Sequence, residues 1–107
     1  MSCPIQISEP DWQEAQRVLS QEVPEWDVWA FGSRARGNAK PYSDLDLAVM
    51  TTDPLPLDRL AALTHAFDAS DMTIRVDVVD WSSISEAFRQ VIAADRVLVR
   101  RATPLCT

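Results

Sequence analysis

The sequence predicts one α/β domain in which helices flank a small mixed β-sheet. Helical and strand-like patterns alternate along the chain, and short segments with proline or glycine separate them. The length of 107 residues suits a single domain with one modest core. The 47% of hydrophobic and 24% of charged residues are typical of a globular protein. We therefore expect residues 1–107 to form one domain.

The first part of the chain predicts a helix followed by a central strand. Ser8 is a suitable capping residue, and Pro10 belongs in a first helical turn. Apolar residues then recur at helical spacing until Pro24. Residues 26–31 are nearly apolar on both faces and rich in aromatic side chains, as expected of a central strand. Gly32 ends this strand.

Two further strands and one helix are expected in the middle of the chain. Residues 44–50 alternate leucine and valine with aspartate and alanine, which predicts the second strand. Residues 74–79 are expected to form the third. Between these strands we expect a helix with four apolar residues on its inner face, namely Leu57, Leu60, Leu63 and Phe67.

The C-terminal part predicts a third helix. Ser83 and Glu86 form a capping-box pattern before it. Residues 97–99 either add a short terminal strand or extend that helix. The periodicity does not fix the order of the strands in the sheet.

A Gly-Ser pair followed after ten residues by Asp-Leu-Asp is the most informative feature of the chain. Asp44 and Asp46 point to the same face of their strand, because side chains alternate. Two carboxylates so close repel each other unless a cation lies between them, and Mg²⁺ favours such ligands. If Val76 and Val78 join the core, Asp77 emerges on the open face and can complete a two-metal site.

The residues around the Gly-Ser pair predict a phosphate-binding turn. Gly32 lets the backbone approach phosphates closely and adopt a positive φ. A helical turn after Ser33 would direct free N–H groups at an anion, and the Ser33 hydroxyl can donate a further hydrogen bond. Arg34 and Arg36 can neutralise phosphate oxygens, and Gly37 allows a second bend.

The charge balance disfavours non-specific binding to nucleic acid. The chain has 16 acidic residues against 10 Lys and Arg, a net charge of -6, whereas such binding needs a basic surface. Residues 1–12 lack the features of a signal peptide, and no segment is long and apolar enough to span a membrane. We expect a cytoplasmic protein in which Cys3 and Cys106 are free thiols.

The motif residues resemble a known family. Gly-Ser-Arg-Ala-Arg-Gly at 32–37, with Ser-Asp-Leu-Asp-Leu at 43–47, resembles the minimal nucleotidyltransferases of the DNA polymerase β-like superfamily. The resemblance covers nearly the whole chain and implies the polymerase β-like fold, with ATP as substrate. It implies that Ser33 holds the β- and γ-phosphates and that Asp44 and Asp46 bind Mg²⁺. Asp77 would join the catalytic metal and help deprotonate the attacking hydroxyl.

The resemblance also implies a protein partner. Minimal proteins of this kind are similar to antitoxins that attach AMP to a tyrosine of a helical HEPN-type ribonuclease toxin. A chain with little room for an acceptor lobe and no basic surface is consistent with that role. Two alternatives stay open. One is a non-catalytic nucleotide- or toxin-binding module that neutralises by occlusion. The other is transfer to a small molecule such as an aminoglycoside, for which a homo-oligomer would supply the acceptor cleft.

Aromatic residues add two open questions. Tyr42, close to the acidic pair, either lines the nucleotide pocket or packs the loop. The chain has four tryptophans, which either pack in the core and at half-buried surface or form a base-stacking or partner patch.

Overall fold

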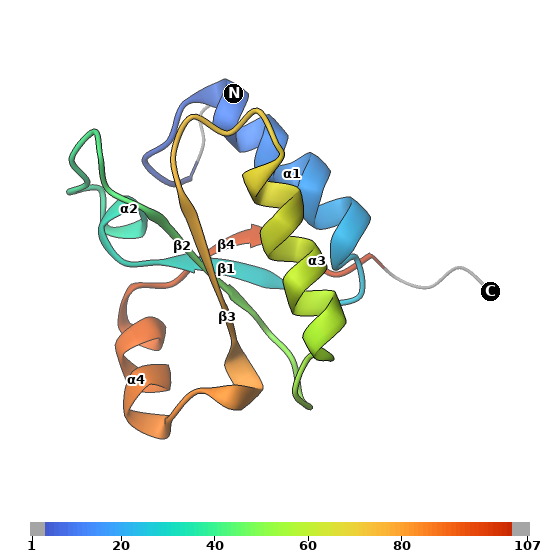
Figure 1. The fold of residues 1–107 in the computed structure, drawn as a ribbon. Coiled ribbons are helices and arrows are strands. Elements are labelled where there is room, and N and C mark those ends of the chain that lie inside the picture. Colours follow the sequence, from blue (N-terminus) through green and yellow to red (C-terminus); the bar gives the residue numbers. More distant parts are fainter. Residues whose placement is uncertain (1–3, 104–107) are drawn as a thin grey trace.

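The computed structural model describes residues 4–103 and contains the expected mixed sheet flanked by helices (Figure 1). Its four strands lie in the order β3-β2-β1-β4. They span Val28–Phe31 (β1), Leu45–Val49 (β2), Val76–Asp80 (β3) and Val97–Arg100 (β4). β1 pairs antiparallel with β2 and β4, whereas β2 and β3 are parallel. Cys3 and Cys106 lie outside the described residues.

The helices cover both faces of the sheet. They span Glu9–Glu22 (α1), Ser33–Arg36 (α2), Leu57–Asp68 (α3) and Glu86–Asp95 (α4), and a 3-10 turn, η1, spans Trp81–Ser83. Figure 1 shows α1 and α3 side by side, with α4 well apart from them. The end of β1 and the starts of the other three strands meet at one end of the sheet, beside α2.

Strand alternation divides the core into two clusters. Leu45, Leu47 and Val49 of β2 are fully buried in the larger cluster, together with apolar residues of α1 and α3. Ala48 belongs to a smaller cluster beneath α4 with Phe31, whose ring meets Phe88 edge-on at 5.8 Å. Asp46 and Asp77 share the α4 side of the sheet, and we call this side the acidic face.

The start of α1 follows the prediction. The Ser8 side chain accepts a hydrogen bond from the Asp11 N–H, and proline occupies the first turn. Ala15, Val18 and Leu19 of this helix are completely or almost completely buried. Burial of this apolar stripe against the sheet stabilises a helix that would be marginal in isolation.

Several predicted details were wrong. Leu57 is 85% exposed, because it occupies the first position of α3 after Pro56, before the helix packs on the sheet. The cap of α4 is Ser85 and not Ser83, because the Ser83 hydroxyl donates to Asp80 within the preceding turn. The first and third strands begin two residues later than predicted. Residues 97–100 form a strand, which resolves the open alternative.

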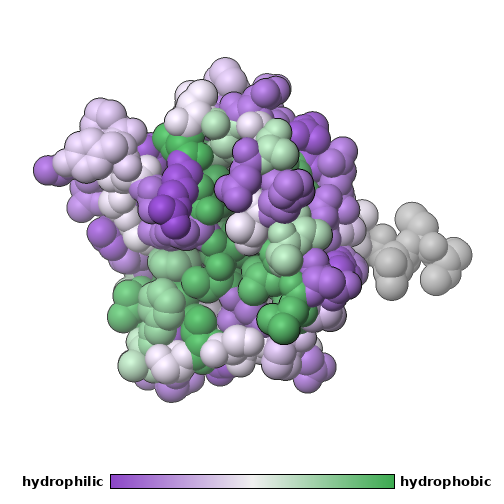
Figure 2. Space-filling model, viewed as in Figure 1, coloured by the Kyte–Doolittle hydropathy of each residue, from purple (hydrophilic) through white to green (hydrophobic). Residues whose placement is uncertain are grey.

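The surface is mixed in character. Figure 2 shows apolar residues over α4 and the start of α3, and polar residues over the α1 side. Val91 of α4 and Leu57 are prominent exposed apolar residues. No helix within residues 4–103 is both long and apolar enough to cross a bilayer.

Candidate active site

Parallel pairing of β2 with β3 places two acidic residues next to each other. Asp46 and Asp77 are register partners across the two strands, and neighbouring strands lie about 4.8 Å apart. Asp44 directly precedes β2 and is close enough to influence the Asp46 carboxyl. The fully buried Leu45 and Leu47 hold the strand in this register, because a one-residue slip would bury the acids instead.

Gly32 lies against the central carboxylate. It connects β1 to α2 with a φ of +78° and a ψ of -159°, a conformation available almost only to glycine. A Cβ atom at this position would lie 2.6 Å from the Asp46 Oδ2. Both the backbone conformation and the close approach therefore require glycine here. The close approach of Gly32 to Asp46 was not predicted from the sequence.

The electrostatics of the site favour a cation. Burial raises the pKa of the Asp46 carboxyl, and the nearby charges of Asp77 and Asp44 raise it further, while Arg36 opposes them. A bound cation would compensate both the lost hydration and the repulsion. Such perturbed carboxyl groups are common in active sites.

Ser33 begins the short α2 helix, so the segment that the sequence left open as a helical turn or a loop starts as a helical turn. Its side chain is half-buried, and within residues 4–103 the hydroxyl has no hydrogen-bond partner. The backbone N–H groups of a first helical turn have no carbonyl partner one turn earlier. Ser33 therefore offers a hydroxyl directly after Gly32, the residue that lies against the Asp46 carboxylate.

Comparison with known proteins identifies the family. Residues 13–103 match the family described as Polymerase beta, Nucleotidyltransferase. The chain belongs to this nucleotidyltransferase family. It is 47% identical over 83 residues to a Haemophilus influenzae protein named "Probable protein adenylyltransferase MntA", and the match covers 78% of this chain and 73% of that protein.

Solved structures share the nucleotidyltransferase fold. A crystal structure of a toxin-antitoxin with AMP-PNP has a TM-score of 0.71 and 23% identity, over 84% of this chain and 73% of the other. The complex of a tri-AMPylated Shewanella oneidensis HEPN toxin with an MNT antitoxin has a TM-score of 0.65 and 22% identity, over 89% and 73%. At these identities the likeness establishes the fold alone.

Arg34 does not have the role predicted for it. The residue is only 6% exposed, and its guanidinium donates hydrogen bonds to the backbone carbonyls of Gln6, Lys40, Pro41 and Ser43. A guanidinium occupied in this way is not available to bind phosphate in this structure. The sequence shows an arginine next to a phosphate turn but does not show its burial, which depends on the N-terminal segment.

Arg36 remains at the site but has a partner that was not predicted. Its Nη1 lies 2.8 Å from the Asp95 Oδ2, so that the pair joins α2 to the end of α4. The Arg36 side chain is 45% exposed, and a pair of this kind contributes little to stability. Its positive charge also acts on Asp46. Arg36 is therefore free enough to meet a phosphate.

Carboxylates are suitable ligands for a divalent metal ion. Nucleotidyltransferases of this family use such an ion together with a nucleoside triphosphate. As placed, no three His, Cys, Asp or Glu side chains between residues 4 and 103 are grouped closely enough to form a complete metal site. The Asp77 side chain is 48% exposed and lies 3.7 Å from the Arg75 Nη2. Mg²⁺ commonly takes several ligands from phosphate and water, so a partial protein set suffices.

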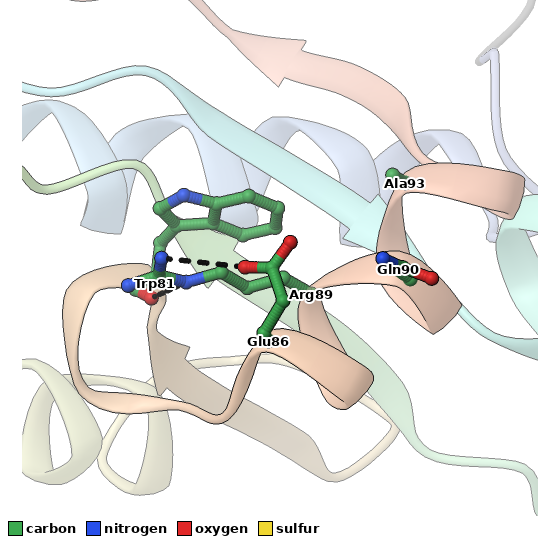
Figure 3. A pocket seen from close by; sticks show the side chains of 5 residues that line it. All are labelled: Trp81, Glu86, Arg89, Gln90 and Ala93. Carbon is green, nitrogen blue, oxygen red and sulfur yellow. Dashed lines mark hydrogen bonds and ion pairs between the residues drawn. The ribbon is translucent and has the colours of Figure 1, made fainter.

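The remaining features near the acidic face were not predicted from any motif. A pocket of about 190 Å³ lies between η1 and α4, lined by Trp81, Glu86, Arg89, Gln90 and Ala93 (Figure 3). Arg89 lies over the Trp81 ring and donates to the carbonyls of Trp81 and Ser82.

Tyr42 is 80% exposed, so it does not pack the loop. All four tryptophans are half-buried.

Proposed function

We propose that this protein transfers AMP from ATP to a hydroxyl group of a partner protein, with Mg²⁺ bound at Asp44, Asp46 and Asp77. The observation that carries the proposal is the register pairing of Asp46 with Asp77 beside Gly32. The adenylyltransferase name of the Haemophilus influenzae relative supports AMP as the transferred group. Two Mg²⁺ ions are the number that the motif leads us to expect.

Each residue has a distinct part in the proposed reaction. Ser33 and the Gly32 turn bind the β- and γ-phosphates, and Arg36 neutralises phosphate charge. Asp77 lies on the edge strand and is half-exposed, so an incoming hydroxyl can reach it. Asp77 takes the proton from that hydroxyl, whose oxygen then bonds to the α-phosphorus. The bond between the α-phosphorus and the bridging oxygen breaks, and pyrophosphate leaves. Bound Mg²⁺ would stabilise the charge that develops on the phosphates.

The partner we propose is a HEPN-type toxin, and the protein acts as its antitoxin. The Shewanella oneidensis complex contains a tri-AMPylated toxin of this type bound to an MNT antitoxin. The resemblance in the motif region implies a tyrosine as the acceptor residue.

Intact-mass analysis of the toxin tests this proposal. A HEPN-type toxin from the same host would be incubated with ATP, Mg²⁺ and either the wild-type protein or Asp46→Asn. We expect the toxin mass to rise by whole AMP units with the wild-type protein only. A Tyr→Phe change at the modified toxin residue should abolish the rise. Full neutralisation by Asp46→Asn, without added mass, would instead support occlusion.

A further inference from the structure

We propose that Arg34 is a positioning residue that holds Asp44 in place through the carbonyl of Ser43. The inference rests on the proposed function, in which Asp44 is a metal ligand. It assigns to Arg34 a part in metal binding without contact with either metal or nucleotide.

The Arg34 guanidinium lies at the centre of the loop that leads to Asp44. Its Nε donates to the Ser43 carbonyl at 2.8 Å, and its Nη2 lies 3.3 Å from the carbonyls of Lys40 and Pro41. Its Nη1 donates to the Gln6 carbonyl at 2.8 Å. No acidic side chain within residues 4–103 pairs with it. Among the described residues, carbonyl dipoles therefore compensate this buried charge.

Peptide geometry transmits the effect to Asp44. The carbonyl that receives the Arg34 Nε belongs to the planar peptide unit that joins Ser43 to Asp44, so its orientation also fixes the Asp44 nitrogen and Cα. On the other side of Asp44, the Leu45 N–H donates to the Arg75 carbonyl at 2.9 Å. Hydrogen bonds thus fix the peptide unit on each side of Asp44, which is the first residue of the acidic pair.

The same loop, residues 38–43, is closed by further hydrogen bonds. The Ala39 N–H donates to the Gln6 Oε1 at 2.9 Å, and the Lys40 N–H donates to the Ser43 Oγ at 2.9 Å. The Gln6 N–H in turn donates to the Arg34 carbonyl at 2.8 Å. Arg34 and Gln6 therefore both hydrogen-bond to the loop at residues 38–43. Through Gln6, the N-terminal segment also helps to position this loop.

Lysine at position 34 is the informative substitution. It keeps the positive charge but lacks the planar set of five donors that reaches several carbonyls at once. If Arg34 acted through its charge on phosphate, Arg34→Lys would bind metal normally and keep most of its affinity for ATP. If it positions Asp44, Arg34→Lys should lose metal affinity itself, because groups that orient metal ligands typically change affinity by about 10- to 100-fold.

The test measures Mn²⁺ binding by electron paramagnetic resonance, without any turnover. The variants are Arg34→Lys and the matched control Arg59→Lys, both compared with wild type. Arg59 donates to the Glu22 carbonyl and pairs with Glu25, on the side of the sheet opposite the acidic face. We expect about 10-fold weaker Mn²⁺ binding for Arg34→Lys and unchanged binding for Arg59→Lys. Excess Mg²⁺ should restore the transfer rate of Arg34→Lys.

A second variant protects the test against misfolding. Gln6→Ala removes the side chain that holds Ala39 without exposing a buried charge, and it should weaken Mn²⁺ binding in the same direction by a smaller factor. Unchanged Mn²⁺ affinity in either folded variant would overturn the proposal. The variant Asp44→Asn tests whether Asp44 binds the metal, separately from whether Arg34 positions Asp44. If Asp44→Asn binds Mn²⁺ as tightly as wild type, the proposed metal site itself is wrong.

Discussion

At the scale of single residues, Gly32 and Asp46 depend on each other. The glycine conformation directs the chain from β1 into α2, and the missing side chain leaves room for the Asp46 carboxylate. In return, the strand that carries Asp46 is fixed by buried leucines on the other face. The phosphate turn and the acidic pair are therefore one structural unit, although ten residues separate them in the sequence.

Gly32→Ala should abolish most of the transfer activity. The added Cβ would lie 2.6 Å from the Asp46 Oδ2, so the carboxylate must move, and a displacement of about 1 Å can cost about 100-fold in rate. Gly37→Ala is the matched control, because Gly37 also has a positive φ of 82° but no atom within 4 Å of the position that an added Cβ would take. Both variants should lose about 1–3 kcal/mol of stability.

Label-transfer rates and thermal unfolding of the two variants check this expectation. We expect similar melting temperatures but much lower activity for Gly32→Ala. Equal loss of activity in both variants would mean that backbone strain, and not the contact with Asp46, determines the effect.

The sequence was sufficient to predict the residues whose position follows from strand alternation. Asp46 and Asp77 share a face because Leu45 and Leu47 are buried and the partly buried Val78 packs against the same core, and this alternation was visible in the pattern. The burial of the Arg34 side chain could not be predicted from the sequence. Its burial depends on the carbonyls of Gln6 and Ser43, which only the folded chain brings together.

At the scale of elements, Asp80 organises the junction where β3 ends. Its buried carboxylate accepts hydrogen bonds from the Thr51 hydroxyl, the Leu55 N–H and the hydroxyls of Ser82 and Ser83. Burial alone would raise the pKa of the Asp80 carboxyl, but these hydrogen bonds together lower it below its ordinary value of 3.8. The junction connects the end of β2, the loop before α3 and the turn before α4.

Asp80→Asn should destabilise the fold by about 2–3 kcal/mol at neutral pH, because an amide cannot accept all of these donors. The lowered pKa means that the Asp80 carboxylate stabilises the protein above pH 3.8. This contribution is lost as the pH falls through the lower folded value. The difference in melting temperature between wild type and Asp80→Asn should therefore be constant near neutral pH and shrink in acid. A difference that grows on acidification would contradict this assignment.

The same junction explains why one element boundary was mispredicted. The Ser83 and Glu86 spacing suits a capping box, but the Ser83 hydroxyl is already used by Asp80. The chain first makes the short η1 turn, and Ser85 then accepts from the Phe88 N–H to begin α4. Local spacing could not distinguish two serines only two residues apart.

At the scale of the whole molecule, the fold exposes the acidic face at one end of the sheet. α1 and α3 cover the opposite face (Figure 1). On the acidic face, α4 covers only the part of the sheet that contains Phe31 and Ala48. The strand order could not be predicted from periodicity, yet it determines that Asp77 lies on an edge strand next to Asp46. This arrangement leaves the Asp77 side chain half-exposed at the edge of the sheet.

Metal and nucleotide together should stabilise the whole domain. A non-hydrolysable ATP analogue with Mg²⁺ at about 100 times its dissociation constant should raise the free energy of unfolding by about 2.7 kcal/mol. The double variant Asp44→Asn/Asp46→Asn should show little of this gain. Thermal unfolding with and without Mg²⁺ measures the effect. An equal gain in the double variant would show that the ligand binds somewhere else.

Transfer of label from ATP is the most direct test of the central claim, that these aspartates modify a partner protein. ATP labelled at the α-phosphate would be added with Mg²⁺ to lysate of the host, with either wild-type protein or the double variant Asp44→Asn/Asp46→Asn. We predict a discrete labelled protein band with the wild type that is absent with the variant. Label in RNA, or an equally strong band with the variant, would contradict the account.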